Sequence, residues 1–248
     1  MSDVFHSTAR LLRGGDAKTV TAAIILAAGK STRMGKNKNK QMMTVNGIPV
    51  LAHTMMAYQD SSLIRDIIVV TRKEEFADVL ALAKQYGIKK LKKVVTGGNS
   101  RQQSAKNGFL HLDADVRYVA IADGARCLTT ADMINRVCMR AYRYQAASAA
   151  HQISSSIKRA SIMGTVMGSV DRRGLWEAQT PQVFHTSLYN AALYKADNDK
   201  VDVTDDNALI EHLGYQIKLV ECGMTNIKIT TPEDISFARA ILAARKKK

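Results

Sequence analysis

TAAIILAAGKSTRMGKNKNKQ, residues 21–41, decides the fold, because an apolar run passes directly into a turn of small residues and then into a basic loop. The run 21–28 predicts a strand that is buried on both faces and ended by Gly29. Ala27, Ala28 and Gly29 have no bulk to keep a ligand from the backbone, and free N–H groups in such a turn bind anions. The following loop carries five cations and no acid: Lys30, Arg33, Lys36, Lys38 and Lys40.

These cations indicate a loop that wraps a polyphosphate, with Arg33 supplying a planar fork for phosphate oxygens. A solvated basic loop is the alternative. Neither common phosphate-binding signature fits. Gly29 and Gly35 have five residues between them, and Lys36 precedes Asn37, so the GxxxxGK[ST] pattern fails. The GxGxxG pattern fails because residue 31 is serine.

Strand and helix patterns alternate along the rest of the chain. Strands are predicted at 65–71, 91–98 and 117–125, and helices at 49–58, 73–87, 100–112 and 130–142. Further on we expect an extended run at 146–153, a helix capped by Thr204, and strands at 215–221 and 226–230. The last expected helix has Thr231 as its cap and Pro232 at its first position. This order predicts a Rossmann-like α/β fold, in which helices cover both faces of a mainly parallel sheet. Ligands bind at the carboxyl ends of such strands, where Gly29, Gly98 and Asp123 fall.

Residues 21–248 are expected to form a single domain, preceded by a mobile polar extension at 1–20 without the apolar core of a signal peptide. One region, 154–182, has no helical period and too few apolar residues for a core. Polar and apolar residues alternate around Gly164 and Gly168, and this pattern predicts a protruding β-arm at about 153–180. An arm without its own core has to pack against a partner, so we expect a homodimer through the arm. A mobile flap is the alternative.

The formal net charge of +14 and pI of about 9.8 favour an anionic partner. The three cysteines lack CxxC spacing and a nearby His cluster, which argues against a disulfide framework or a zinc site and fits a reducing, cytoplasmic location. No apolar stretch approaches the ~20 residues of a membrane helix, so we expect no membrane partner. Aromatic residues are only 6%, and no basic run is interleaved with them, so we expect no nucleic-acid partner. A basic nucleic-acid-binding protein stays open as an alternative because of the charge and the GIKKLKK stretch at 87–93.

Six segments, in order, resemble the 2-C-methyl-D-erythritol 4-phosphate cytidylyltransferase family of the sugar nucleotidyltransferase superfamily. They are AAGKSTRMG with NKQ (27–41), TGGNSRQQS (96–104), ADGAR (122–126), VDRRGLWEAQTPQVF (170–184), TDDNALIE (204–211) and NIKITTPED (226–234). The resemblance implies the nucleotidyltransferase fold and a reaction of CTP with 2-C-methyl-D-erythritol 4-phosphate. The products would be 4-diphosphocytidyl-2-C-methyl-D-erythritol and pyrophosphate, with Mg²⁺ as cofactor, in the non-mevalonate isoprenoid pathway.

The same resemblance implies roles for individual residues. The catalytic residues would be Arg33, Lys40 and Lys228, and the nucleotide-binding residues Ala27, Ala28, Gly29, Gly98, Asn99 and Ser104. Asp123 would hold Mg²⁺ and would bind substrate together with Arg126, Ser156, Arg172 and Thr204. Ser156 and Arg172 would reach the alcohol phosphate across the dimer interface. From the residues alone, Asp123 can also be a turn acid, Lys228 a solvated strand lysine, and Thr204 a helix cap.

Several positions depart from the family pattern. Asn39 stands where the family has proline, and its backbone is therefore expected to be freer before Lys40. Gly124 and Cys127 alter the turn after Asp123, Ser155 removes a charge before Ser156, and Asn99 replaces a common aspartate. None of these removes a phosphate-neutralising cation or the metal acid, so we expect a working enzyme. A cytidylyltransferase that makes CDP-ribitol from ribitol 5-phosphate shares the CTP half of the site and stays open as an alternative.

Overall fold

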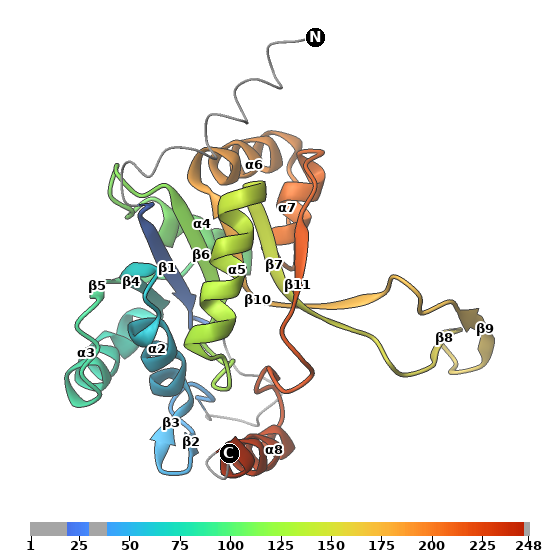
Figure 1. Cartoon of the computed structure of the whole chain (residues 1–248), viewed down its shortest axis with the longest axis horizontal. Helices are drawn as coiled ribbons and strands as arrows, with labels where there is room; N and C mark the ends of the chain where they lie inside the picture. The colour runs from blue at the N-terminus through green and yellow to red at the C-terminus, as the bar shows by residue number, and fades with distance from the viewer. Residues whose placement is uncertain (1–18, 30–38, 246–248) are drawn as a thin grey trace.

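The computed structural model describes residues 19–29 and 39–245 (Figure 1). Arg33, the neighbouring loop cations from Lys30 to Lys38 and nearly all of the predicted N-terminal extension lie outside these residues. Within the described residues, a 7-stranded sheet has the order β11-β7-β10-β6-β1-β4-β5. Its strands are β1 (Thr21–Leu26), β4 (Ile64–Thr71), β5 (Leu91–Thr96), β6 (Tyr118–Asp123), β7 (Ala146–Gln152), β10 (Trp176–His185) and β11 (Lys218–Glu221).

The sheet is mainly parallel, as predicted. β1 pairs in parallel with β4 and β6, β4 with β5, and β11 with β7. β10 is antiparallel to both of its neighbours, β6 and β7, so it runs against the rest of the described sheet. The parallel arrangement brings the carboxyl ends of β1, β5 and β6 to one edge of the sheet.

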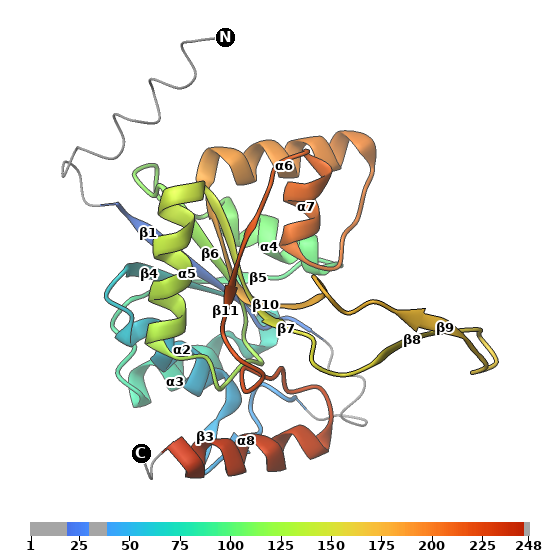
Figure 2. The ribbon, with the colours of Figure 1, turned by 45° about the vertical axis from the view of Figure 1, so that its right-hand side comes forward.

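Helices cover both faces (Figures 1 and 2). One core cluster contains residues of α2 (Val50–Asp60), α3 (Phe76–Gln85) and α5 (Ala131–Tyr144), and a second contains residues of α4 (Arg101–Phe109), α6 (Thr186–Asp199) and α7 (Asp206–His212). Ala23 and Ile25 of β1 belong to the first cluster and Ile24 to the second, because alternate strand residues point to opposite faces. The predicted strand, buried on both faces, is therefore confirmed.

A third, smaller cluster joins α8 (Pro232–Arg245) to the short hairpin of β2 (Thr44–Val45) and β3 (Ile48–Pro49). α8 begins at Pro232, as the sequence predicts. Asp234 accepts hydrogen bonds from the backbone amides of Thr230 and Thr231, at 2.7 and 2.8 Å, and so fixes the helix start. Among the described residues, no helix has both the length and the apolar character needed to cross a membrane.

The predicted arm projects from the body as a hairpin in which β8 (Ile157–Ala160) pairs antiparallel with β9 (Val166–Val170) (Figures 1 and 2). The predicted C-terminal boundary of the arm is wrong. β10 begins at Trp176, which pairs with Gln152 of β7, so residues 176–180 belong to the main sheet. This strand was hidden because its buried positions include polar residues, Gln179, Thr180 and Gln182.

Two further expectations need correction, and one helix was not expected. Thr204 does not cap α7, because Asp205 is the cap and its side chain accepts from the Ala208 amide at 3.1 Å. Residues 226–230 form no strand, although the Ile229 amide donates to the Ala125 carbonyl at 2.8 Å. α6 was not predicted, yet its buried residues have helical spacing: Tyr189, Ala192, Leu193 and Ala196.

Candidate active site

A cavity of about 550 Å³ lies at the edge of the sheet where β1 and β6 end. Leu26, Ala28 and Gly29 line it from the end of β1, and Asp123 and Ala125 from the end of β6. The remaining lining residues come from three other stretches of chain: Lys40, Gln41, Gly98, Asn99, Ser100, Arg101, Ser104 and Lys228. The structure thus brings together Ala28, Gly29, Lys40, Gly98, Asn99, Ser104, Asp123 and Lys228, all of which the sequence had predicted.

The backbone wall of the cavity depends on two glycines between β5 and α4. A Cβ atom on Gly97 would lie 2.4 Å from Ala28 Cβ, and one on Gly98 would lie 2.1 Å from Gln103 Cγ. A side chain at position 97 would therefore force the loop away from the end of β1, and one at position 98 would force it away from the first turns of α4. The Gly98 amide donates to Ser104 Oγ at 3.0 Å, and Ser104 Oγ donates to the Ser100 carbonyl at 2.9 Å. Ser104 thus fixes the shape of the loop that lines the cavity.

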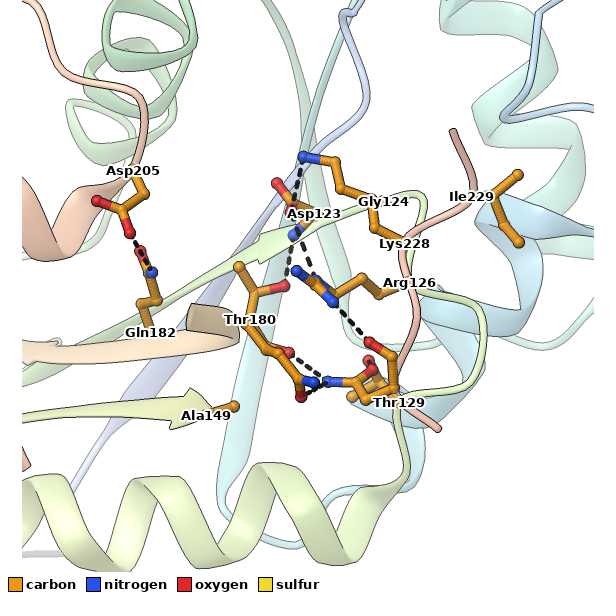
Figure 3. Close-up of polar contacts among 12 residues, drawn as sticks. Asp123, Gly124, Arg126, Thr129, Ala149, Thr180, Gln182, Asp205, Lys228 and Ile229 are labelled. Carbon is orange, nitrogen blue, oxygen red and sulfur yellow. Dashed lines mark hydrogen bonds and ion pairs between the residues drawn. The ribbon is translucent and has the colours of Figure 1, made fainter. Parts of the chain in front are cut away.

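Asp123 is the last residue of β6 and lies among three cations, of which Figure 3 draws Lys228 and Arg126. Its carboxylate is 3.0 Å from Lys228 Nζ, 3.5 Å from Arg101 Nε and 3.6 Å from Arg126 Nε. Burial favours the neutral acid, but the combined attraction of Lys228, Arg101 and Arg126 outweighs it and lowers the pKa of Asp123 to about 2. The carboxyl group is therefore ionised at neutral pH. The Asp123 amide donates to Thr180 Oγ1 at 3.0 Å, which ties the end of β6 to β10.

Arg126 is buried and is not among the residues that line the cavity. Its Nη1 donates to the Asn226 carbonyl at 2.5 Å, and its guanidinium faces Asp123 (Figure 3). The Asn226 side chain in turn donates to the Thr180 carbonyl at 3.0 Å. These contacts anchor the segment that carries Lys228, and Lys228 is paired with Asp123 instead of standing on a solvated strand. A substrate-facing role for Arg126 stays a prediction.

Lys40 lines the cavity from the segment that precedes β2. Its Nζ donates to the Ile229 carbonyl at 3.0 Å. Asn39, which was expected to free the backbone before Lys40, instead donates a side-chain hydrogen bond to Glu75 at 2.5 Å.

Burial raises the pKa of Cys127 to about 11, so this residue is a neutral thiol and not a nucleophile.

Arg101 is a charged cavity residue that sequence reasoning missed. It lies in the first turn of α4, forms a short ion pair with the buried carboxylate of Asp206, and extends its Nε to within 3.5 Å of Asp123. Tyr189 also donates to Asp206, at 2.6 Å. The signal was present, because Arg101 lies inside the TGGNSRQQS stretch and directly follows the helix cap Ser100.

Besides Arg126, four predicted site residues within the described part of the chain do not line the cavity. Ala27 is buried beside it, with its amide donating to the Val70 carbonyl at 2.7 Å. Ser156 and Arg172 are exposed on the arm, where Arg172 donates to the Ser154 carbonyl. Thr204 is exposed just before α7. The substrate contacts expected of Ser156, Arg172 and Thr204 stay predictions.

Asp123 is the one acid among the described residues that line the cavity. Across residues 19–29 and 39–245, no cluster of three or more His, Cys, Asp or Glu side chains could hold a metal ion. Mg²⁺ often binds through one or two carboxylates together with substrate phosphates and keeps several waters. A single ionised carboxylate beside a cavity of about 550 Å³ fits an ion that arrives with a nucleotide.

The mainly parallel sheet carries, at the ends of its strands, a cavity lined by backbone and by cationic side chains. These features define the chain as a nucleotidyltransferase of the α/β class. It belongs to the 2-C-methyl-D-erythritol 4-phosphate cytidylyltransferase family, whose model matches residues 21–244. Both the fold class and the family predicted from the sequence are confirmed.

Individual relatives agree with the family assignment. The chain is 42% identical over 223 residues to the 2-C-methyl-D-erythritol 4-phosphate cytidylyltransferase of Caldanaerobacter subterraneus subsp. tengcongensis, covering 89% of this chain and 98% of that protein. It is 39% identical over 225 residues to the enzyme of the same name from Pelotomaculum thermopropionicum, covering 90% and 94%. Its structure is similar to that of 4-diphosphocytidyl-2C-methyl-D-erythritol synthase from Anaerococcus prevotii, with a TM-score of 0.80, 28% identity, and coverage of 91% and 97%.

Proposed function

We propose that this chain joins CTP to 2-C-methyl-D-erythritol 4-phosphate, giving 4-diphosphocytidyl-2-C-methyl-D-erythritol and pyrophosphate in the non-mevalonate isoprenoid pathway. One observation carries the proposal. In a member of this family, Lys40, Lys228 and Asp123 converge with the backbone of Ala28, Gly29 and Gly98 on one cavity. Cations and small backbone residues around a single space suit a triphosphate.

In the proposed reaction, a phosphate oxygen of the alcohol phosphate attacks the α-phosphorus of CTP in line. The new P–O bond forms as the bond from the α-phosphorus to the bridging oxygen breaks, and pyrophosphate leaves with the electron pair. The protein forms no bond to either substrate, so catalysis consists of positioning and charge stabilisation. Lys40 and Lys228 line the cavity and would neutralise the negative charge on the reacting phosphates. Asp123 would hold Lys228 in place through their 3.0 Å ion pair.

Mg²⁺ is proposed as the cofactor, entering with CTP and held by Asp123. When bound, it would neutralise charge on the nucleotide phosphates. Lys228 already lies against Asp123 Oδ2. A lysine so close to the only acid among the described lining residues would take over part of the charge neutralisation that a second metal ion would otherwise supply.

The remaining proposals concern the oligomeric state and the cellular location of the enzyme. A homodimer through the arm is supported by the exposed apolar side chains at its tip, among them Ile162, Met163 and Met167. A cytoplasmic location is supported by the three buried, unpaired cysteines, which suit a reducing compartment.

The test is pyrophosphate release from CTP with each of two acceptors, 2-C-methyl-D-erythritol 4-phosphate and ribitol 5-phosphate. We expect turnover with the first alone, and Lys40→Ala and Asp123→Asn each to lower kcat by roughly 100-fold or more. Lys195→Ala and Asp113→Asn are matched controls, because both side chains are partly exposed surface groups that do not line the cavity. Turnover with ribitol 5-phosphate alone would replace the proposed acceptor. Full activity in both cavity variants would refute the proposed site.

A further inference from the structure

Glu75 is a buried carboxylate outside the cavity, with 4% of its surface exposed. It ends the short helix η2 (Lys73–Glu75), just after β4. Thr71 Oγ1 and the Arg72 guanidinium donate to it, as does the Arg72 amide at 3.3 Å. Burial opposes ionisation, but these donors outweigh it and hold the pKa of Glu75 below its usual range. An ionised, fixed acceptor therefore stands at the end of β4.

A further donor to Glu75 comes from a distant part of the chain, the segment that carries Lys40. Asn39 Nδ2 donates to Glu75 Oε1 at 2.5 Å. The other end of the same amide, Asn39 Oδ1, accepts from the Gln41 amide at 3.0 Å. The Asn39 carbonyl accepts from the Met42 amide at 3.1 Å. One side chain thus both shapes a turn and fastens it to the body of the protein.

Lys40 lies inside this turn. On its C-terminal side, the Gln41 carbonyl accepts from the Leu51 amide of α2 at 3.0 Å. Its backbone is therefore held from both flanks, by Glu75 through Asn39 and by α2 through Gln41. Its Nζ is directed to the Ile229 carbonyl and the cavity.

We propose that the Asn39–Glu75 contact is a positioning device for Lys40, in which a charge-assisted hydrogen bond to a buried acceptor fixes where the ammonium group meets the phosphates. The inference rests on the proposed function, because it assigns the contact to the same reaction. Misplacing a catalytic group by about 1 Å can cost up to 100-fold in rate. Asn39 and Glu75 are positioning residues, since they act through Lys40.

The test uses the full-length protein and three variants: Asn39→Ala, the equal-sized Asn39→Asp, and Glu75→Gln. We expect Asn39→Ala and Glu75→Gln each to lower kcat about tenfold, with KM for CTP changed less than about twofold, because Lys40 acts mainly in the transition state. Asn39→Asp cannot donate to Glu75 and would place two carboxylates together, so its loss of kcat should be at least as large. The double variant Asn39→Ala/Glu75→Gln should be no slower than the slower single variant, because Asn39→Ala removes the same contact that Glu75→Gln weakens by taking away the charge of its acceptor.

A stability readout and a control separate positioning from folding. The thermal midpoint of Asn39→Ala should stay within about 2 °C of the parent's, while hydrogen exchange should speed up at the Gln41 and Met42 amides. Asn135→Ala is the matched control, because Asn135 accepts from Ser61 at 2.6 Å and joins two elements away from the cavity. Its kcat should be unchanged.

Wild-type kcat in Asn39→Ala, or multiplied losses in the double variant, would overturn the inference. If the parent itself released no pyrophosphate, the proposed function would fail instead. Unchanged exchange at Gln41 and Met42 in Asn39→Ala would then still reject the contact as the anchor of the turn.

Discussion

Asp123 lies among more positive charge than one carboxylate can balance. Lys228, Arg101 and Arg126 all lie within 3.6 Å of its oxygens, although Asp206 shares Arg101. A ligand carrying several negative charges would complete this balance. The arrangement explains why a site that binds phosphates can contain an acid, since the acid orders the cations before the ligand arrives.

The lowered pKa of Asp123 predicts how the free energy of unfolding depends on pH. Its pKa is about 2 in the folded protein and 3.8 ordinarily, so its contribution to the free energy of unfolding is complete above pH 3.8 and is lost as the pH falls through about 2. We expect Asp123→Asn to be less stable by about 2 kcal/mol at pH 7, with the gap closing across that acid range. Urea unfolding of both proteins at a series of pH values measures the gap. A gap that stayed constant down to pH 2 would show that Asp123 is not held ionised by its neighbours.

At the scale of residues, the sequence predicted those site positions whose chemistry is visible locally. Gly29, Gly98 and Asp123 follow apolar runs, so their place at strand ends could be predicted from the pattern alone. Arg101 could not be assigned in this way, because its role depends on Asp206, which lies 105 positions later in the chain. The same holds for Asn39, whose partner Glu75 is identified only by the fold.

At the scale of elements, Arg101 fastens the start of α4 to the start of α7. Arg101→Met would leave the buried carboxylate of Asp206 without its cation, so we expect it to lower the free energy of unfolding by about 3–5 kcal/mol. Adding Asp206→Asn should recover part of that loss, because the buried charge is then gone as well. Lys106→Met is the control, since Lys106 and Asp197 form an exposed pair between α4 and α6 worth under about 1 kcal/mol.

Urea unfolding of the three variants and the parent measures these differences. An Arg101→Met protein no less stable than Lys106→Met would show that the pair does not join the two helices. A double variant less stable than Arg101→Met would show that Asp206 stabilises the fold by some means other than this ion pair.

Whether a strand could be predicted from the sequence depends on the kind of residue that it buries. Strands with continuous apolar runs, such as β1 and β4, were predicted, because a strand buried on both faces needs no polar residue. β10 was not, because its polar side chains find partners inside the protein. Gln182 Oε1, for example, accepts from the Asp206 amide at 3.0 Å. In the sequence, a buried polar residue whose hydrogen-bond partner lies far along the chain looks the same as a polar residue of a loop.

At the scale of the whole molecule, the arm projects away from the body (Figures 1 and 2). Arg172 and Ser156 lie on it, both exposed, and neither lines the cavity. If these two residues bind the alcohol phosphate, as the family resemblance implies, the arm has to deliver them to the cavity of a second subunit.

Mixing two inactive variants tests this arrangement. Arg172→Ala and Asp123→Asn should each be nearly inactive alone. In a mixed dimer, the Arg172→Ala subunit keeps an intact Asp123 and would receive Arg172 from its partner, so one of the two sites is complete. With equal amounts and random exchange of subunits, half of the dimers are mixed, and activity should return to about a quarter of the parent's. If Arg172 served the cavity of its own chain, no mixed site would be complete and the mixture would stay inactive. Sedimentation of the mixture confirms that dimers have formed, so an inactive mixture of dimers would reject exchange of the arms.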